Sequence, residues 1–531
     1  INIIPREPTR SSAQLSHTLT SLGGSNSYDN NTMLNASIVS ESGRAGISVF
    51  GQSRHRSGYD HDGDGFTELP VISSQSVGMR SFFRTGAYSR ITAQYHHIDE
   101  YRRGGDLLKQ PPHEAFVAEQ TDHAIDGGSL SFDISSADRS NRFNAYASFQ
   151  NTARKSYYGS KQDLDAYGTT HDLTLAAGMQ YVHAFRKLLF MPSELTLGTE
   201  YSYDDLSDRS IGYDIRTDQA VHIVGAYLQN EWKTRKWSLL IGGRLDKHNL
   251  VDHAIFSPRA NVRFNPSESV NLRVSYAGGY RAPQAYNEDL HIDALDNKVA
   301  IIRLAPDLKP EYSHSLSASV DLYHNFGRVQ ANLLVEGFYT MLEDVFTLEK
   351  IGEDAQGNII KERRNASGAT VAGVGAEAKA GIPGRFELQL GYTFQRSRYD
   401  EPEKCSDDVT PQRRMFRSPD HYGYLTANVN LTRDFTASVF GNYTGRMLVQ
   451  HNAGYIERDT ERLTPDFWDM GLRLSYNFRL TKQLRLELNA GVKNLFDSFQ
   501  KDLDFGQNKD AAYIYGPAVP RTYFIGAKFA L

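Results

Sequence analysis

The chain has 531 residues, a net charge of −5 and a mean hydropathy of −0.51. No stretch approaches the roughly 18 consecutive apolar residues of a membrane-spanning helix, which excludes a helical membrane protein. The small, mixed charge gives no reason to expect a nucleic-acid partner. At about 150 residues per domain, the length of the chain alone suggests three domains. A closed barrel, however, grows by adding strands to one wall and stays one domain.

Apolar and polar residues alternate with the period of a β-strand along many segments. In 385–395, Phe386, Leu388 and Leu390 alternate with charged or polar neighbours, and 472–480 and 484–493 repeat the pattern across a short turn. Soluble strands average about 5–6 residues, whereas these approach the roughly 9–11 that cross a bilayer at a tilt. Their polar face carries Arg, Glu and Gln in mid-strand, as a hydrated lumen allows. Length and polar face therefore argue against a soluble sandwich.

Similar segments recur along the whole chain and predict an all-β fold, a transmembrane antiparallel β-barrel of about 22 strands. We place the strands near 12–22, 31–41, 44–54, 72–85, 87–99, 124–135, 139–153, 169–184, 193–205, 218–233, 236–248, 256–265, 269–280, 312–325, 328–349, 359–381, 385–399, 420–432, 435–449, 466–479, 483–495 and 520–531. The long polar segments are expected to be external loops: 55–70, 102–122, 154–168, 282–311, 400–418 and 450–465.

The last strand ends the polypeptide. In "RTYFIGAKFAL", Tyr523, Ile525 and Phe529 share one face, opposite Thr522 and Lys528. We expect this strand to pair with the first and close the barrel, because an open edge in lipid leaves backbone groups unpaired. The lone Cys405 lies in a polar stretch where an exposed loop is expected, and one thiol cannot form an internal disulfide.

Four segments, in order, resemble the TonB-dependent outer-membrane receptors, notably members from Bacteroidetes-like bacteria. They are "INIIPREP" at the start, "GYRAPQAYNEDLHI" and "APDLKPEYSHS" in the middle, and the tail from "NLFDSFQ" to "PRTYFIGAKFAL". The resemblance covers the chain from end to end. It implies an active transporter in the outer membrane of a Gram-negative bacterium that imports a scarce metal complex.

The resemblance also implies a division of the chain and a set of partners. Residues 1–10 correspond to the end of a plug and its linker, and 11–531 to the barrel. The plug and the TonB-contacting segment of the family are expected upstream of Ile1, as is any export signal. Expected partners are outer-membrane lipid, the TonB complex through that upstream part, a metal chelate and, as a further candidate, a surface lipoprotein.

One acidic motif has the composition of a calcium loop. "DHDGDGFTE" places Asp60, Asp62 and Asp64 at alternate positions, with Gly65 next and Glu68 three residues later. Carboxylate oxygens at this spacing suit Ca²⁺, and the glycine permits a sharp turn. The motif departs from an EF-hand, since its acid falls at position 9 and no helices flank it. The motif is therefore either a calcium-binding loop or an acidic external turn.

The middle boxes supply candidate ligand-binding residues. In haem receptors of the family, a His between these boxes ligates the iron, and His291 holds that place here. The boxes also occur in relatives that do not bind haem, where such a His is a polar loop residue. A siderophore saturates its own iron and needs aromatic and cationic groups instead, for which we name Tyr280, Arg281 and Tyr286.

The leading hypothesis is import of a ferric siderophore, with haem or a corrinoid as the alternative. Lumen arginines such as Arg273, Arg473 and Arg485 either guide an anionic chelate or form a charge ladder with neighbouring strands. A passive porin-like channel, with roughly 16–18 strands, is an alternative of another class, and an outer-membrane enzyme or adhesin is a third. No H-E-x-x-H, G-x-S-x-G or Gly-Lys motif is present, so we expect no enzyme and no catalytic cofactor.

Overall fold

The computed structural model describes residues 7–290, 292–295, 298–355, 357–404 and 406–531, and it consists almost entirely of β-strands. The main sheet has 23 strands, of which β22 (Gln412–Arg414) is a short addition to β21. The other 22 form a closed antiparallel barrel, as the sequence predicts. Among the described residues, no helix is long and apolar enough to cross a membrane.

The first half of the barrel is formed by long strands that follow one another in chain order. They are β1 (Ser12–Leu22), β2 (Tyr28–Val39), β3 (Ala45–Arg56), β4 (Val71–Gly86), β5 (Ser89–Gly105), β6 (Val117–Ser135), β7 (Asn141–Ser160), β8 (Tyr167–Leu188), β9 (Met191–Ser210), β10 (Ile215–Lys233) and β11 (Trp237–His248).

The second half continues in the same antiparallel order, interrupted only by strands that belong to loops. The barrel strands are β12 (Ile255–Ser267), β13 (Val270–Arg281), β16 (Glu311–Phe326), β17 (Val329–Glu343), β20 (Ala369–Ile382), β21 (Phe386–Glu403), β23 (His421–Asn430), β24 (Phe435–Thr444), β27 (Phe467–Arg479), β28 (Arg485–Lys493) and β29 (Thr522–Ala530). The loops add the short 3-10 helices η1 (Pro112–Glu114) and η2 (Asn287–Leu290).

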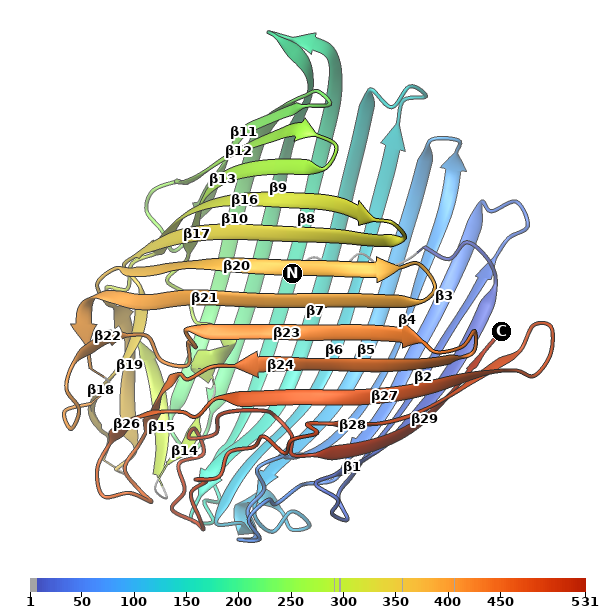
Figure 1. Ribbon diagram of the computed structural model, residues 1–531. Helices are drawn as coiled ribbons and strands as arrows, with labels where there is room; N and C mark the ends of the chain where they lie inside the picture. The colour runs from blue at the N-terminus through green and yellow to red at the C-terminus, as the bar shows by residue number, and fades with distance from the viewer. Residues whose placement is uncertain (1–6, 291, 296–297, 356, 405) are drawn as a thin grey trace.

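The barrel closes where the last strand meets the first. β1 pairs with β29 in antiparallel register from Gln14 opposite Ala530 to Leu22 opposite Thr522. The start of β1 and the end of β29 therefore lie at one end of the barrel, which we call the turn end, where strands are joined by short turns such as 327–328. The long connections gather at the opposite end, the loop end (Figure 1).

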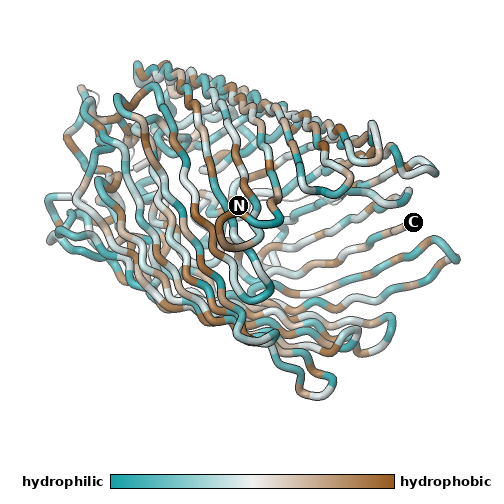
Figure 2. The backbone as a smooth tube through the Cα atoms, turned by 90° about the horizontal axis from the view of Figure 1, so that it is seen from above, coloured by the Kyte–Doolittle hydropathy of each residue, from teal (hydrophilic) through white to brown (hydrophobic). Residues whose placement is uncertain are grey.

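The alternation read from the sequence corresponds to the two faces of the barrel strands, and Figure 2 shows it along the whole tube. In β29, Tyr523, Ile525 and Phe529 are 50%, 61% and 41% exposed, whereas Lys528 on the other face pairs with Glu487 of β28. The apolar face looks outward to lipid and the polar face toward the lumen, as expected for a barrel that crosses a membrane.

Three predicted strands were too long because loop strands follow barrel strands closely. The predicted segment 328–349 contains β17 and then β18 (Phe346–Glu353), separated by Asp344 at φ 54°. The predicted segment 359–381 likewise contains β19 (Ile359–Asn365) before β20. The segment 435–449 runs from β24 into β25 (Leu448–His451), which pairs with β26 (Thr460–Leu463).

The loop 282–311 was also predicted without strands and contains two, β14 (Asp293–Leu295) and β15 (Lys298–Leu304). Together with β18 and β19, these two strands form a separate sheet, the loop sheet, in the order β14-β15-β19-β18. β15 and β19 run parallel and come from different loops, so the sheet joins the β13–β16 and β17–β20 connections at the loop end (Figure 1).

Candidate functional site

The loop sheet packs against the barrel wall through apolar side chains. Tyr158 of β7 lies in a buried cluster with Ile292, Val299, Ile301 and Ile360. This cluster fixes the loops of one side of the barrel against the wall of the other side. The mouth at the loop end is thereby divided, and two cavities lie within it.

The first cavity, which we call the wall cavity, has a volume of about 580 Å³. One side is the inner surface of β5, β6 and β7, and the other side is formed by the connections 57–70 and 494–521, with η2 touching one edge. Its charged and aromatic lining includes both signs of charge: Phe66, Glu68, Glu100, Arg102, Glu119, His123, Arg154, Tyr158, Asp504, Lys509, Asp510 and Tyr513.

Arg154 is the most enclosed cation of the wall cavity. Its guanidinium donates to Thr170 at 2.9 Å and lies 3.2 Å from Asp208. It also lies 3.4 Å from the Asn287 side-chain oxygen, which connects the wall to η2. His123 lies beside it, and its Nδ1 is buried without a hydrogen-bond partner among the described residues. The wall cavity therefore offers a ligand a cation that its neighbours hold in place.

The second cavity, the sheet cavity, has a volume of about 870 Å³ and lies beside the loop sheet. It is lined by cationic and aromatic groups from the end of β13, from β18 and β19 and from β21 with the residue after it, together with acidic groups. The lining includes Arg281, Glu288, Phe346, Lys350, Glu353, Lys361, Arg363, Tyr399, Glu403 and Lys404.

Arg281 is the predicted site residue that lies in this lining. Its guanidinium stacks over the Tyr286 ring at 4.1 Å and over Phe346 at 5.2 Å, and it pairs with Glu288 at 2.6 Å. That hydrogen bond, with the nearby Arg363, lowers the pKa of Glu288. Arg363 is itself buried and pairs with Asp289 at 2.5 Å. The structure thus brings Arg281 and Tyr286 into contact, and their role in binding a chelate stays a prediction.

The other two predicted ligand residues have different outcomes. Tyr280 precedes Arg281 at the end of β13 and does not line either cavity. His291 lies outside the described residues, as does Cys405, so their predicted roles remain predictions. Tyr286 donates its hydroxyl to the Ala282 carbonyl at 2.8 Å, which fixes its ring under Arg281.

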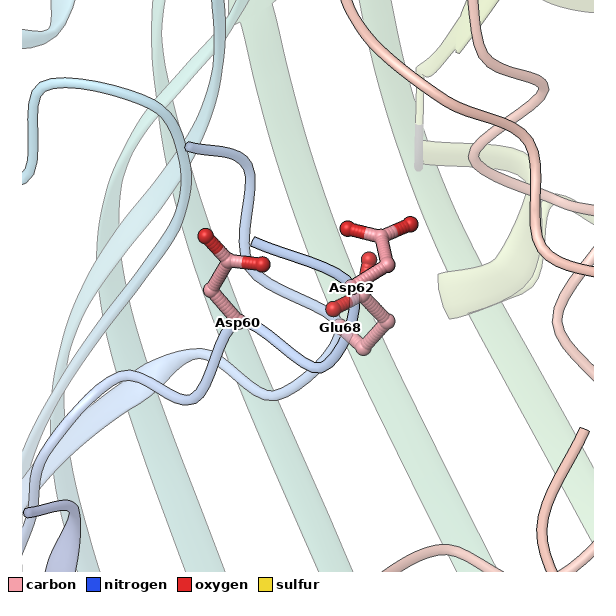
Figure 3. Close-up of side chains that lie close together, drawn as sticks. All are labelled: Asp60, Asp62 and Glu68. Carbon is pink, nitrogen blue, oxygen red and sulfur yellow. The ribbon is translucent and has the colours of Figure 1, made fainter. Parts of the chain in front are cut away.

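The acidic loop 60–68 brings three of its four predicted carboxylates together (Figure 3). One oxygen each of Asp60, Asp62 and Glu68 lies within 4.8 Å of the others. Partial desolvation and the carboxylates of Glu68 and Asp64 raise the pKa of Asp62 to about 6. This geometry is compatible with a bound cation. The fourth predicted carboxylate, Asp64, lies outside this group.

Asp64 and Glu68 both form ion pairs with the side chain of Lys509. The Nζ of Lys509 lies 3.1 Å from Asp64 Oδ2 and 2.9 Å from Glu68 Oε1. The Gly506 amide also donates to Asp64, at 2.7 Å. Sequence reasoning missed Lys509, because it lies 441 residues from Glu68 and nothing local to "GQNKD" marks it as a partner.

One of the three lumen arginines has the partner expected of a charge ladder. Arg473 lies 2.5 Å from Glu487, and Lys528 lies 2.6 Å from the other oxygen of the same carboxylate. For Arg273 and Arg485, the part of the chain that the structure describes provides no ion pair. The ion pair of Arg473 fits a charge ladder, and the other two arginines remain candidates for contact with a ligand or a plug.

Comparisons with known proteins agree with this architecture. Residues 8–495 match the family described as TonB dependent receptor-like, beta-barrel. No curated protein sequence matches the chain.

Several solved structures share the fold. The siderophore receptor PirA of Acinetobacter baumannii matches with a TM-score of 0.76 at 16% identity, covering 99% of this chain and 81% of that one. A mutant of the ferric enterobactin receptor PfeA of Pseudomonas aeruginosa matches at 0.75 and 15% identity, covering 99% and 81%. The ferric-catecholate import receptor Fiu of E. coli matches at 0.71 and 14% identity, covering 99% and 82%.

These findings assign the barrel to a membrane and exclude the porin alternative, since porins have roughly 16–18 strands and plugged transporters 22. The loop end is the extracellular end and the turn end the periplasmic one, because barrels of this kind have long outer loops and short inner turns. The chain belongs to the TonB-dependent receptors and is their β-barrel domain, a multi-pass protein of the Gram-negative outer membrane.

Proposed function

We propose that this barrel belongs to a receptor that imports a ferric siderophore. The observation that carries the proposal is the stack of Arg281 between Tyr286 and Phe346 at the edge of the sheet cavity. A cation held against aromatic rings suits an anionic chelate with flat, electron-rich groups. The iron of such a chelate is already saturated, so the protein needs no ligand to the metal.

The fold neighbours support the same substrate class. The solved receptors with the same architecture are named for siderophores, enterobactin or catecholates. Haem or a corrinoid is the alternative cargo within the family. Haem iron needs an axial ligand, usually His or Tyr, and His291 is the residue that the sequence offers for that role. We further propose that the protein has no enzymatic activity and that a surface lipoprotein is a candidate partner.

The proposal is tested by growth of a deletion strain that carries the full-length receptor. Each culture receives one source: a ferric catecholate, a ferric hydroxamate, haem or, in a corrinoid-requiring strain, a corrinoid. We expect receptor-dependent growth on a siderophore. His291→Ala should leave that growth intact and should abolish growth on haem if haem is the cargo.

A matched pair of arginine variants tests the site. Arg281→Ala removes a charged hydrogen-bonding group, a change of about 1.5–3 kcal/mol, which corresponds to roughly tenfold or more in Kd. Arg235→Ala, at an exposed turn of the opposite end of the barrel, should have little effect on siderophore binding. Equal binding by both variants and the parent would remove the sheet cavity from the proposal, and growth on haem alone would replace the siderophore as cargo.

A further inference from the structure

The connection between β28 and β29 lies across the wall cavity from the barrel wall. Residues 494–521 contain no helix or strand, yet Leu503, Asp504, Lys509, Asp510 and Tyr513 of this segment line the cavity. The barrel wall supplies Thr121, His123 and Arg154 on the opposite side. Side-chain contacts at two places hold the part of the segment that lines the cavity, and Arg417 also donates to the carbonyls of Ala512 and Ile514.

The first place is the β25–β26 hairpin. His451, with a side chain 3% exposed, lies 2.9 Å from Asp504 and stacks on Tyr513 with ring centroids 3.6 Å apart. The neighbouring Asn452 donates to Asp510 at 2.8 Å. Several independent contacts therefore hold this side of the segment, so that the loss of any single charge leaves others in place.

The second place is the acidic loop 60–68, where Lys509 is the main attachment. Its ammonium lies between Asp64 and Glu68. The side chain of Lys509 is 14% exposed, and those of Asp64 and Glu68 are 0% and 2% exposed. The Gly506 amide adds one hydrogen bond to the same Asp64 carboxylate, and the Phe499 ring packs on His61 at 4.6 Å. Buried carboxylates without a cation are strongly unfavourable, so this attachment depends on the charge of Lys509.

We propose that residues 494–521 form a lid over the wall cavity, with the β25–β26 hairpin as its fixed side and Lys509 as its latch. With the latch closed, the ammonium neutralises Asp64 and Glu68 and holds the segment against the 57–70 connection. When that ion pair breaks, the two carboxylates become hydrated and the lid moves away from loop 60–68. The wall cavity then opens to the outside. This lid does not depend on which chelate is carried.

The test measures access to a thiol inside the cavity. In the full-length receptor, Cys405→Ser removes the only cysteine of the sequence and Thr121→Cys introduces one in the cavity lining. Intact cells are treated with a membrane-impermeant maleimide, and the labelling rate is measured. We expect slow labelling with the latch intact and labelling at least tenfold faster after Lys509→Met.

Two matched variants separate the charge of the latch from general damage. Lys509→Arg keeps the charge and should label as slowly as the parent. Lys501→Met removes an exposed lysine of the same segment and should also label slowly. Heat-dependent gel migration confirms that each barrel is folded. Rates within twofold for Lys509→Met and the parent, or fast labelling already in the parent, would overturn the proposal.

Discussion

At the level of single residues, buried charges at the loop end occur in hydrogen-bonded groups. Lys509 pairs with Asp64 and Glu68, Arg154 with Asp208, and Arg363 with Asp289. Such groups are costly to bury and more costly to break by removing one member. They therefore fix the positions of loops that have little backbone pairing of their own.

Asp62 is exposed, and partial desolvation together with the carboxylates of Glu68 and Asp64 raises its pKa to about 6. A carboxyl whose folded pKa exceeds its unfolded value favours the folded state when protonated. Its contribution is complete below the unfolded pKa near 4 and is lost as the pH rises through about 6. In chelator, Asp62→Asn should raise the melting temperature at pH 7.5. The gain in the free energy of unfolding should be less than about 1 kcal/mol, because the charge is so exposed. At pH 4 it should have no effect.

The matched control for this thermal measurement is Asp252→Asn, in another connection at the loop end, which should be neutral at both pH values. Calcium provides the second arm. If loop 60–68 holds Ca²⁺, the Asp62→Asn variant should melt below the parent in calcium, because the ion loses a ligand. If the variant instead melts above the parent by the same margin in calcium as in chelator, the loop is an acidic external turn.

Sequence reasoning found the parts of the site whose residues lie close together along the chain, and it missed those whose residues lie far apart. Arg281 and Tyr286 lie five positions apart in one motif, and the structure brings them together. The loop 60–68 was marked by its own spacing. Its partner Lys509 and the wall cavity were not predictable, because they arise from strands and connections at opposite ends of the sequence that meet only when β1 pairs with β29.

At the level of strands, alternation predicted all 22 barrel strands, and β1 at Ser12–Leu22 coincides with its predicted range. The signal is strong there because each strand has one face in lipid and one in the lumen. It failed at β18 and β19, which lie next to β17 and β20 in the sequence and were assigned to the barrel although they form a sheet in the mouth. A period of two identifies a strand but not the sheet to which it belongs.

The terminal strand offers a direct test of which face meets lipid. Ile525→Arg in β29 places a charge on the outward face and should destabilise the barrel by about 2–4 kcal/mol if the residue lies near the bilayer midplane. Urea titration of the folded barrel in lipid vesicles gives this value. Ser475→Arg, on the inward face of β27, is the comparison and should cost much less. An equal loss for both variants would contradict the assignment of faces.

At the level of the whole molecule, the barrel is a scaffold that places two cavities under its extracellular loops. The loop sheet forms one boundary of the sheet cavity, and the 494–521 connection forms one boundary of the wall cavity. The fold belongs to receptors that bind a chelate and depend on TonB for energy. Import by this protein should therefore be selective and driven, rather than passive.

The central claim is tested most directly by uptake of a radiolabelled ferric siderophore into a deletion strain carrying the full-length receptor. We predict uptake that saturates with concentration and stops when a protonophore removes the energy supply or when TonB is deleted. Uptake that rises linearly with concentration and continues in the presence of the protonophore would contradict the account, since it would show a passive pore.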